Sequence, residues 1–279
     1  MYFVATEYTI LGFDQSRWTR KVAVPTPSSG SELKTQLERI VTTLWSPEPT
    51  PKRGPKRAFT RDGVVATAIS LADARGIDAL SMRTLAEELG LGTMSLYRYV
   101  PGKEELIALM IERLYGETTS AGGIEGGWRD KLEAMAHEQW NLYHRHPWML
   151  NLPLDFISPG PIAMERFDAG IASVLEAGLP PDAAVAINGA IEYIVRGAAR
   201  ASIENLTFVA ETGMTIEQWW EHQGPSLLAV MDTSKFPALQ AALDAGAFST
   251  AGQDDSFEAA FHETLGIFLD GVAVRVASS

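Results

Sequence analysis

The sequence predicts an all-α fold, and three observations carry this prediction. Apolar residues recur at intervals of three and four along most of the chain, which is the period of an amphipathic helix. No two neighbouring segments show the alternating pattern and hairpin turn of a pair of strands. With 279 residues, of which 46% are hydrophobic, the chain is long enough to bury a large core in two domains.

Residues 1–57 form an N-terminal extension and a basic linker. Residues 31–45 place their apolar side chains on one stripe behind a possible cap at Ser31, which predicts a short amphipathic helix that needs a partner surface. The prolines of residues 47–55 then predict a stiff, extended linker. This linker ends in the basic sequence PKRGPKR, whose charged residues are Lys52, Arg53, Lys56 and Arg57.

A helical domain is predicted for residues 58–118. Its first helix spans residues 60–76, because Thr60 can cap the start and Gly76 ends the apolar periodicity. Its last helix begins near Lys103, where the following carboxylates lie in the first turn and complement the helix dipole.

Between these two helices, residues 81–100 predict two short helices joined by a tight turn. Gly90 lies where the first helix must stop, at a position that favours positive φ. Ala86 lies four residues earlier and lets the second helix cross closely, and apolar residues follow five and eight positions after Leu91. This spacing is typical of a helix-turn-helix, whose second helix lies in the major groove of DNA. An ordinary helical hairpin in a core is the alternative interpretation.

The outer face of the second helix carries donors, an aromatic ring and a guanidinium that packing does not require. Contacts to base edges are expected from Thr93, Met94, Ser95 and Arg98. Contacts to phosphates are expected from Arg61, Thr84, Tyr97, Tyr99 and Lys103. The basic linker residues Lys52, Arg53, Lys56 and Arg57 are expected to enter the minor groove.

Residues 60–106 resemble the N-terminal domain of the TetR family of transcriptional regulators. The matching positions are Thr60-Arg61, Ala68, Gly76, Ser81-Met82-Arg83, Leu85-Ala86, Leu89-Gly90-Leu91, Leu96-Tyr97-Arg98-Tyr99-Val100 and Lys103-Glu104-Glu105-Leu106. Most TetR-like chains begin just before the helix at Thr60, so the extension departs from the pattern. Three roles stay open for residues 1–50: a docking helix, an extra DNA contact, or no role.

Residues 119–279 predict a larger helical domain. Helices are expected at residues 128–145, 162–177, 182–206, 215–231 and 256–276. The segment resembles the C-terminal domain of the tetracycline-repressor subgroup, chiefly at His146-Pro147-Trp148, Gly160-Pro161 and Phe268-Leu269-Asp270-Gly271. The resemblance implies a ligand-binding and dimerisation domain, in which helices 182–206 and 256–276 of two subunits form a four-helix bundle. Small residues in the first helix and the apolar side chains Ile187, Ile191, Ile194, Phe261, Leu265 and Phe268 fit this role, and intrachain core helices are the alternative.

A pocket for an unidentified small-molecule effector is the candidate site of this domain. Its expected lining residues are Trp140, Tyr143, His144, Trp148, Phe156, Phe167, Asn188, Glu192 and Tyr193. Aromatic residues on helices are also common in ordinary cores. In tetracycline-binding relatives a His near the end of the corresponding helix contacts the ligand, and His144 falls close to that place. The second His of those relatives has no counterpart near Ser158-Pro159, so tetracycline itself is not the expected effector.

Neither a metal nor a cofactor is expected. His144 and His146 are two residues apart, so on a helix they point about 200° from one another and do not reach one ion. No nucleophile elbow, phosphate-binding loop, dinucleotide fingerprint or zinc spacing occurs in the sequence. A metal-dependent hydrolase that uses His137, His144 and acidic residues is kept as a remote alternative, and a second alternative is a helical interaction protein that keeps the hairpin as a scaffold without binding DNA.

Composition and charge favour a cytoplasmic protein without a membrane segment. The chain has no cysteine, no run of apolar residues long enough to span a bilayer, and no signal-peptide pattern at its start. The net charge is −12, but residues 1–57 carry 9 Lys and Arg against 5 Asp and Glu, whereas residues 116–279 carry 8 against 22. Because charges are screened over about 8 Å, an acidic distant domain does not prevent DNA binding.

The function predicted from the sequence is that of a ligand-responsive transcriptional regulator, with repression favoured over activation. A homodimer would place two copies of residues 93–99 in successive major grooves of a palindromic operator, about 34–36 Å apart. An effector that binds better to the splayed dimer would shift the population away from the DNA-bound form.

Overall fold

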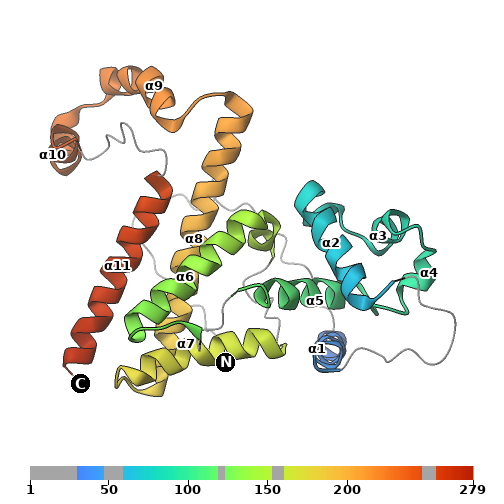
Figure 1. Ribbon diagram of the computed structural model, residues 1–279. Coiled ribbons are helices and arrows are strands. Elements are labelled where there is room, and N and C mark those ends of the chain that lie inside the picture. Colours follow the sequence, from blue (N-terminus) through green and yellow to red (C-terminus); the bar gives the residue numbers. More distant parts are fainter. Residues whose placement is uncertain (1–29, 47–58, 119–122, 153–159, 247–255, 279) are drawn as a thin grey trace.

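The computed structural model describes residues 30–46, 59–118, 123–152, 160–246 and 256–278, and all regular structure within them is helical. This confirms the predicted all-α fold. Figure 1 shows two groups of helices, and α5 (Lys103–Tyr115) of the first group contacts α7 (Pro161–Glu176) of the second. No helix within the described segments is long and apolar enough to cross a membrane.

The first group contains the predicted helix-turn-helix. In chain order its helices are α1 (Gly30–Trp45), α2 (Arg61–Arg75), the 3-10 helix η2 (Ile77–Ala79), α3 (Met82–Glu88), α4 (Thr93–Leu96) and α5. As predicted, the Thr60 hydroxyl caps α2 by accepting a hydrogen bond of 3.0 Å from the backbone N–H of Gly63. The helix ends at Gly76, which has a φ of +78° that favours glycine.

The second group is built around the long helix α8. Its helices are α6 (Trp128–Arg145), the 3-10 helix η4 (Pro147–Asn151), α7 (Pro161–Glu176), α8 (Pro181–Thr212), α9 (Ile216–Val230), the 3-10 helix η5 (Thr233–Lys235), α10 (Pro237–Asp244) and α11 (Ser256–Ala277). Helix α8 packs against α6, α7 and α11. One continuous cluster of buried apolar side chains extends from α2 through α5 into α8 and α11.

Polar contacts also connect the two groups. The carboxylate of Glu112 in α5 accepts hydrogen bonds from the backbone N–H groups of Ile162 (2.9 Å) and Ala163 (3.1 Å), at the start of α7. The carboxylate of Asp73 in α2 accepts a hydrogen bond of 2.8 Å from the indole N–H of Trp148 and lies 2.8 Å from Nδ1 of His146. The orientation of the first group therefore depends on α7 and η4.

The structure differs from the sequence prediction at three helices. Helix α8 was predicted to end at residue 206 but continues to Thr212, where Gly213, with a φ of +67°, ends it. The prediction stopped early because residues 207–212 are mostly exposed and show no continuous apolar stripe. Helix α10 was not predicted, since it is short and none of its residues is buried. Helix α4 has only four residues, and residues 97–99 continue it as turns. Figure 1 shows α9 and α10 projecting from the body of the molecule.

Candidate nucleic-acid interface and effector cavity

The turn between α3 and α4 has the geometry that the sequence predicts for a helix-turn-helix. Gly90 has a φ of +65°, and the N–H of Leu91 donates a hydrogen bond of 2.8 Å to the carbonyl of Ala86. Ala86 and Leu96 are buried where the two helices cross. Because these contacts fix the inner face of α4, its opposite face is turned to solvent.

The residues predicted to contact bases lie at this outer face. Met94 is 80% exposed, and Arg98 is also exposed. Thr93 and Ser95 are partly exposed. The four side chains therefore share an accessible surface that a DNA groove can reach, and their contacts to DNA stay a prediction.

The residues predicted to contact phosphates differ in how exposed their side chains are. Tyr97 is exposed, and Tyr99 is partly buried against the core. Lys103 lies at the N-terminus of α5 and is partly exposed. The hydroxyl of Thr84 forms a hydrogen bond of 2.7 Å with the hydroxyl of Ser81, the residue that caps the start of α3.

Arg61 was predicted to contact a phosphate, but its guanidinium faces α1. It donates hydrogen bonds of 3.4 Å to the backbone carbonyls of Thr43 and Ser46. The basic linker was also assigned to DNA contacts, and its charged residues lie outside the described part of the chain: Lys52, Arg53, Lys56 and Arg57.

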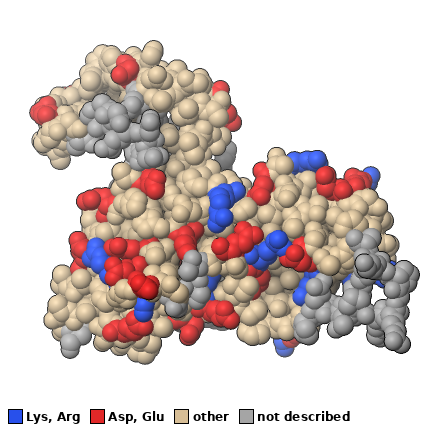
Figure 2. Space-filling model, viewed as in Figure 1, with Lys and Arg blue, Asp and Glu red and all other residues tan. Residues whose placement is uncertain are grey.

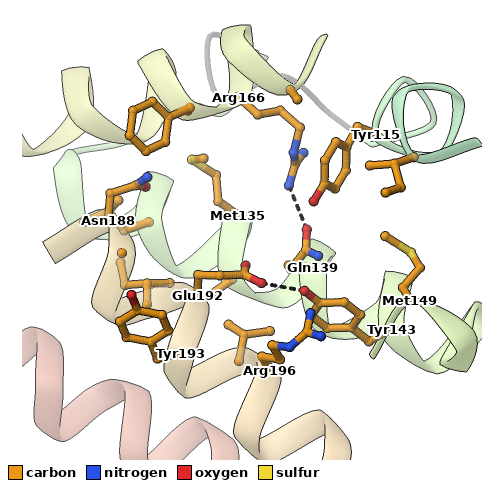
Figure 3. Close-up of a pocket in the computed structure, with 18 of the residues that line it drawn as sticks. Tyr115, Met135, Gln139, Tyr143, Met149, Arg166, Asn188, Glu192, Tyr193 and Arg196 are labelled. Atoms are coloured by element: carbon orange, nitrogen blue, oxygen red, sulfur yellow. Dashed lines mark hydrogen bonds between the residues drawn. The ribbon is translucent and has the colours of Figure 1, made fainter. Parts of the chain in front are cut away.

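A cavity of about 720 Å³ lies between the helices of the second group and the end of α5. Five of the predicted effector-binding residues line it: Tyr143, Phe167, Asn188, Glu192 and Tyr193. Figure 3 shows Tyr143 projecting from α6 toward Glu192 of α8, while Asn188 and Tyr193 lie on the opposite side of Glu192 in this view. The remaining walls come from the end of α5, from α7 and from η4.

Three other predicted residues lie outside this cavity. Trp140 stacks on Phe261 with ring centroids 4.6 Å apart, and His144 lies 3.0 Å from the hydroxyl of Ser202. Both follow a cavity residue by one position on α6, and one position rotates the side chain by about 100°. Trp148 is buried and points to Asp73 instead. Phe156 lies outside the described residues.

Several lining residues were missed in the sequence. Met135 and Gln139 precede Tyr143 by eight and four positions on α6, so helical spacing from Tyr143 identifies them. The other missed residues include Tyr115, Met164, Arg166 and Arg196. No signal in the sequence marks Tyr115, because it lies at the end of α5, in the helix assigned to the DNA-binding domain.

The polar groups of the cavity are held by specific contacts. The hydroxyl of Tyr143 donates a hydrogen bond of 2.5 Å to Glu192, and burial raises the pKa of both groups. Burial also raises the pKa of Tyr115 to about 12. A guanidinium has only hydrogen-bond donors, so the side-chain oxygen of Gln139 is the acceptor that faces Arg166, at a distance of 3.5 Å.

The side-chain amide of Gln139 is a buried polar group of this cavity. The residue is 5% exposed, and its amide nitrogen makes no hydrogen bond of good geometry in the described part of the chain, although the side chain interacts with the hydroxyl of Tyr115. A largely apolar cavity with a few polar groups is the usual form of a small-molecule site. By contrast, the described residues contain no group of three or more His, Cys, Asp or Glu that could hold a metal ion.

Helices α8 and α11 each present apolar side chains on two faces. Ile187, Ile191, Phe261 and Leu265, which the sequence assigned to a dimer, are buried within the subunit. A second set is exposed: Val185, Tyr193, Ile267 and Val274. Figure 2 shows Asp and Glu side chains gathered in the region of α6 and α7, as the acidic second half of the sequence predicts.

Known proteins resemble the chain over most of its length. Residues 64–110 match bacterial regulatory proteins of the tetR family, and residues 123–276 match the tetracyclin repressor-like C-terminal domain. The HTH-type transcriptional repressor DrrR1 of Streptomyces coeruleorubidus is 38% identical over 256 residues, or 90% of each chain. The tetracycline repressor protein class A from transposon 1721 of Escherichia coli is 30% identical over 216 residues, which cover 76% of this chain and 89% of that protein.

Solved structures share the fold. ActR of Streptomyces coelicolor in complex with actinorhodin has a TM-score of 0.62 and 23% identity, covering 79% of this chain and 99% of that chain. Apo ActR has a TM-score of 0.60 and 24% identity, covering 78% and 99%. The two matched regions and the identity to DrrR1 together show that the chain belongs to the TetR family of DNA-binding transcriptional regulators, which are not enzymes.

Proposed function

We propose that the chain is a homodimeric repressor that leaves a palindromic operator when a small hydrophobic effector enters the cavity. One observation carries this proposal. Helix α5 begins at Lys103, seven residues after the end of α4, and its last turns carry Ile111 and Tyr115, which line the cavity. A single rigid helix thus connects the candidate DNA surface with the candidate effector site.

TetR-family regulators dimerise, and the exposed faces of α8 and α11 support a dimer here. Both helices carry exposed apolar side chains: Val185 and Tyr193 on α8, and Ile267 and Val274 on α11. Tyr193 is 67% exposed. Glycines on both helices have open space where a Cβ would lie, so a second copy can approach the backbone closely. Two copies of these helices would form a four-helix bundle.

The twofold axis of such a dimer requires two operator half-sites. The α4 helices would enter major grooves about 34–36 Å apart, or a multiple of that distance. Arg98, Thr93, Ser95 and Met94 would read base edges, and Lys103 would contact a phosphate. A protein that binds operator DNA would act in the cytoplasm.

The cavity supports an effector with apolar bulk and at least one acceptor oxygen. Its volume of about 720 Å³ suits a molecule of drug size. The amide N–H group of Gln139, which makes no hydrogen bond of good geometry in the described part of the chain, would donate to the acceptor oxygen. ActR, which shares the fold, has been solved in complex with actinorhodin and with (S)-DNPA, so a protein of this architecture can hold small molecules.

Effector binding would reach the DNA-binding surface through contacts already described. Ala163 and Phe167 of α7 line the cavity, and the N-terminus of α7 is held by Glu112 of α5. Met149 of η4 also lines the cavity, and η4 contacts Asp73 of α2 through Trp148. A 100-fold loss of DNA affinity requires an effector preference of only about 2.7 kcal/mol between the two states.

The proposal is tested by titrating the protein against duplex DNA from upstream of its own gene. Arg98→Ala should weaken operator binding by roughly 10-fold to 100-fold while leaving binding to unrelated DNA nearly unchanged, because a base contact contributes about 1–3 kcal/mol. Arg75→Ala is the matched control, since Arg75 is paired with Glu88 at 3.6 Å on the far end of α2. Wild-type protein without salt-sensitive, sequence-selective binding would contradict the proposal.

A further inference from the structure

Helix α1 lies outside both family matches, which cover residues 64–110 and 123–276, yet it is docked on the DNA-binding domain. Its inner face buries Ile40 and Leu44 against Ala108 of α5, and Leu109 packs beside them. Figure 1 shows α1 next to α5, on the side away from α2 and α3. Of the three roles left open by the sequence, the structure therefore supports a docking helix.

A buried carboxylate of α5 depends on α1 for its counter-charge. Glu105 lies in the first turn of α5, and its side chain is only 2% exposed. Its Oε1 has no hydrogen bond in the described part of the chain, but it lies 3.1 Å from Nε of Arg39 in α1. Removing Arg39 would leave the buried carboxylate without its ion-pair partner, which is strongly unfavourable.

A second contact holds the C-terminal end of α1. Arg61, the first residue of α2, donates hydrogen bonds to the carbonyls of Thr43 and Ser46. These carbonyls lie at the C-terminus of α1, where a cation complements the helix dipole. Helix α1 is therefore tied to the first turns of both α2 and α5.

We propose that α1 is an additional helix of the DNA-binding domain and that Arg39 is a positioning residue for the DNA contact at the start of α5. Lys103 lies two residues before Glu105, at the first position of that helix. Arg39 holds this turn in place and neutralises its buried carboxylate. The second part of the inference rests on the proposed function; the docking of α1 does not.

The test compares four variants with wild-type protein. Arg39→Ala removes the counter-charge, and Arg39→Lys retains the charge. In Arg39→Ala/Glu105→Gln the buried carboxylate is also removed. Lys34→Ala is the matched control, because Lys34 is an exposed α1 cation paired with Glu38 at 3.9 Å.

Two measurements separate docking from DNA binding. The first is thermal unfolding of the dimer at fixed protein concentration. The second is fluorescence anisotropy with operator duplex from upstream of the gene, repeated over a series of salt concentrations. The salt dependence matters because the slope of log affinity against log salt decreases in size by about one when a single phosphate is no longer neutralised.

Arg39→Ala should lower the unfolding temperature by several degrees and weaken operator binding about 10-fold or more, with a salt slope smaller by about one if Lys103 no longer reaches its phosphate. Arg39→Lys and the double variant should restore most of both quantities, and Lys34→Ala should match wild type. The proposal is overturned if Arg39→Ala behaves like Lys34→Ala, or if Glu105→Gln fails to rescue it. If unfolding follows these expectations but wild type binds no operator, the proposed function fails and the docking of α1 stands.

Discussion

Glu112 offers a direct way to measure how firmly the two groups of helices are joined. Its carboxylate accepts hydrogen bonds of 2.9 and 3.1 Å from two backbone N–H groups at the N-terminus of α7, and the residue is 7% exposed. Each such bond to a charged group contributes about 1.5–3 kcal/mol, and partial access of water to the freed N–H groups reduces the loss. We therefore expect Glu112→Ala to cost about 3 kcal/mol of unfolding free energy.

This loss should lower the unfolding temperature by roughly 6–12 °C, because 1 kcal/mol corresponds to about 2–4 °C in a chain of this size. Glu112→Gln retains an acceptor oxygen without the charge, so it should cost about half as much. Glu117→Ala is the matched control: Glu117 is a half-exposed carboxylate 3.9 Å from Arg113, and its removal should cost less than about 1 kcal/mol.

The assay is differential scanning calorimetry at one dimer concentration, since dimerisation makes the transition depend on concentration. Glu112→Ala should also separate the single transition into two, because the DNA-binding helices are then joined less firmly to α7. If Glu112→Ala unfolds at the same temperature as Glu117→Ala, Glu112 does not join the two groups, and the proposed route from effector to DNA is refuted at its central step.

Two further predictions concern the helix-turn-helix and the cavity. Gly90→Ala should destabilise the protein by about 1–2 kcal/mol and weaken operator binding, because Gly90 has a φ of +65° that a Cβ disfavours; an unchanged unfolding temperature would contradict this. Burial raises the pKa of Glu192, so its carboxyl resists ionisation more in the folded protein than in the unfolded chain, where it titrates at about pH 4.3. Glu192→Gln should therefore raise the unfolding temperature above about pH 5, with a difference that vanishes as the pH falls through about 4.3. A less stable variant at pH 8 would refute this.

The sequence predicted the helices best where one face is buried and the ends carry clear signals. Helix α6 spans Trp128–Arg145 as predicted, and the Thr60 cap and Gly76 end of α2 match as well. Helix α10 was missed because its eight residues are too few to establish a helical period, although Leu239 and Leu243 lie on one face.

The cavity shows why a set of suitable residue types does not define a site. Periodicity assigns residues to a face of a helix, but it does not say which neighbour that face meets. Trp140 and Tyr143 both looked suitable, yet Trp140 stacks on Phe261 while Tyr143 enters the cavity. Arg166 was overlooked because its role depends on Gln139 and Thr118, which belong to other elements. Such groupings arise only from tertiary packing.

The account depends most on a dimer that presents two copies of α4 to one face of DNA. Hydroxyl-radical footprinting of the purified protein on DNA upstream of its gene tests this directly. We predict two symmetric protected patches whose centres are about one helical turn, 34–36 Å, or a multiple of it apart, and their loss in Arg98→Ala. A single unsymmetric patch, or no protection at any salt concentration, would contradict the account.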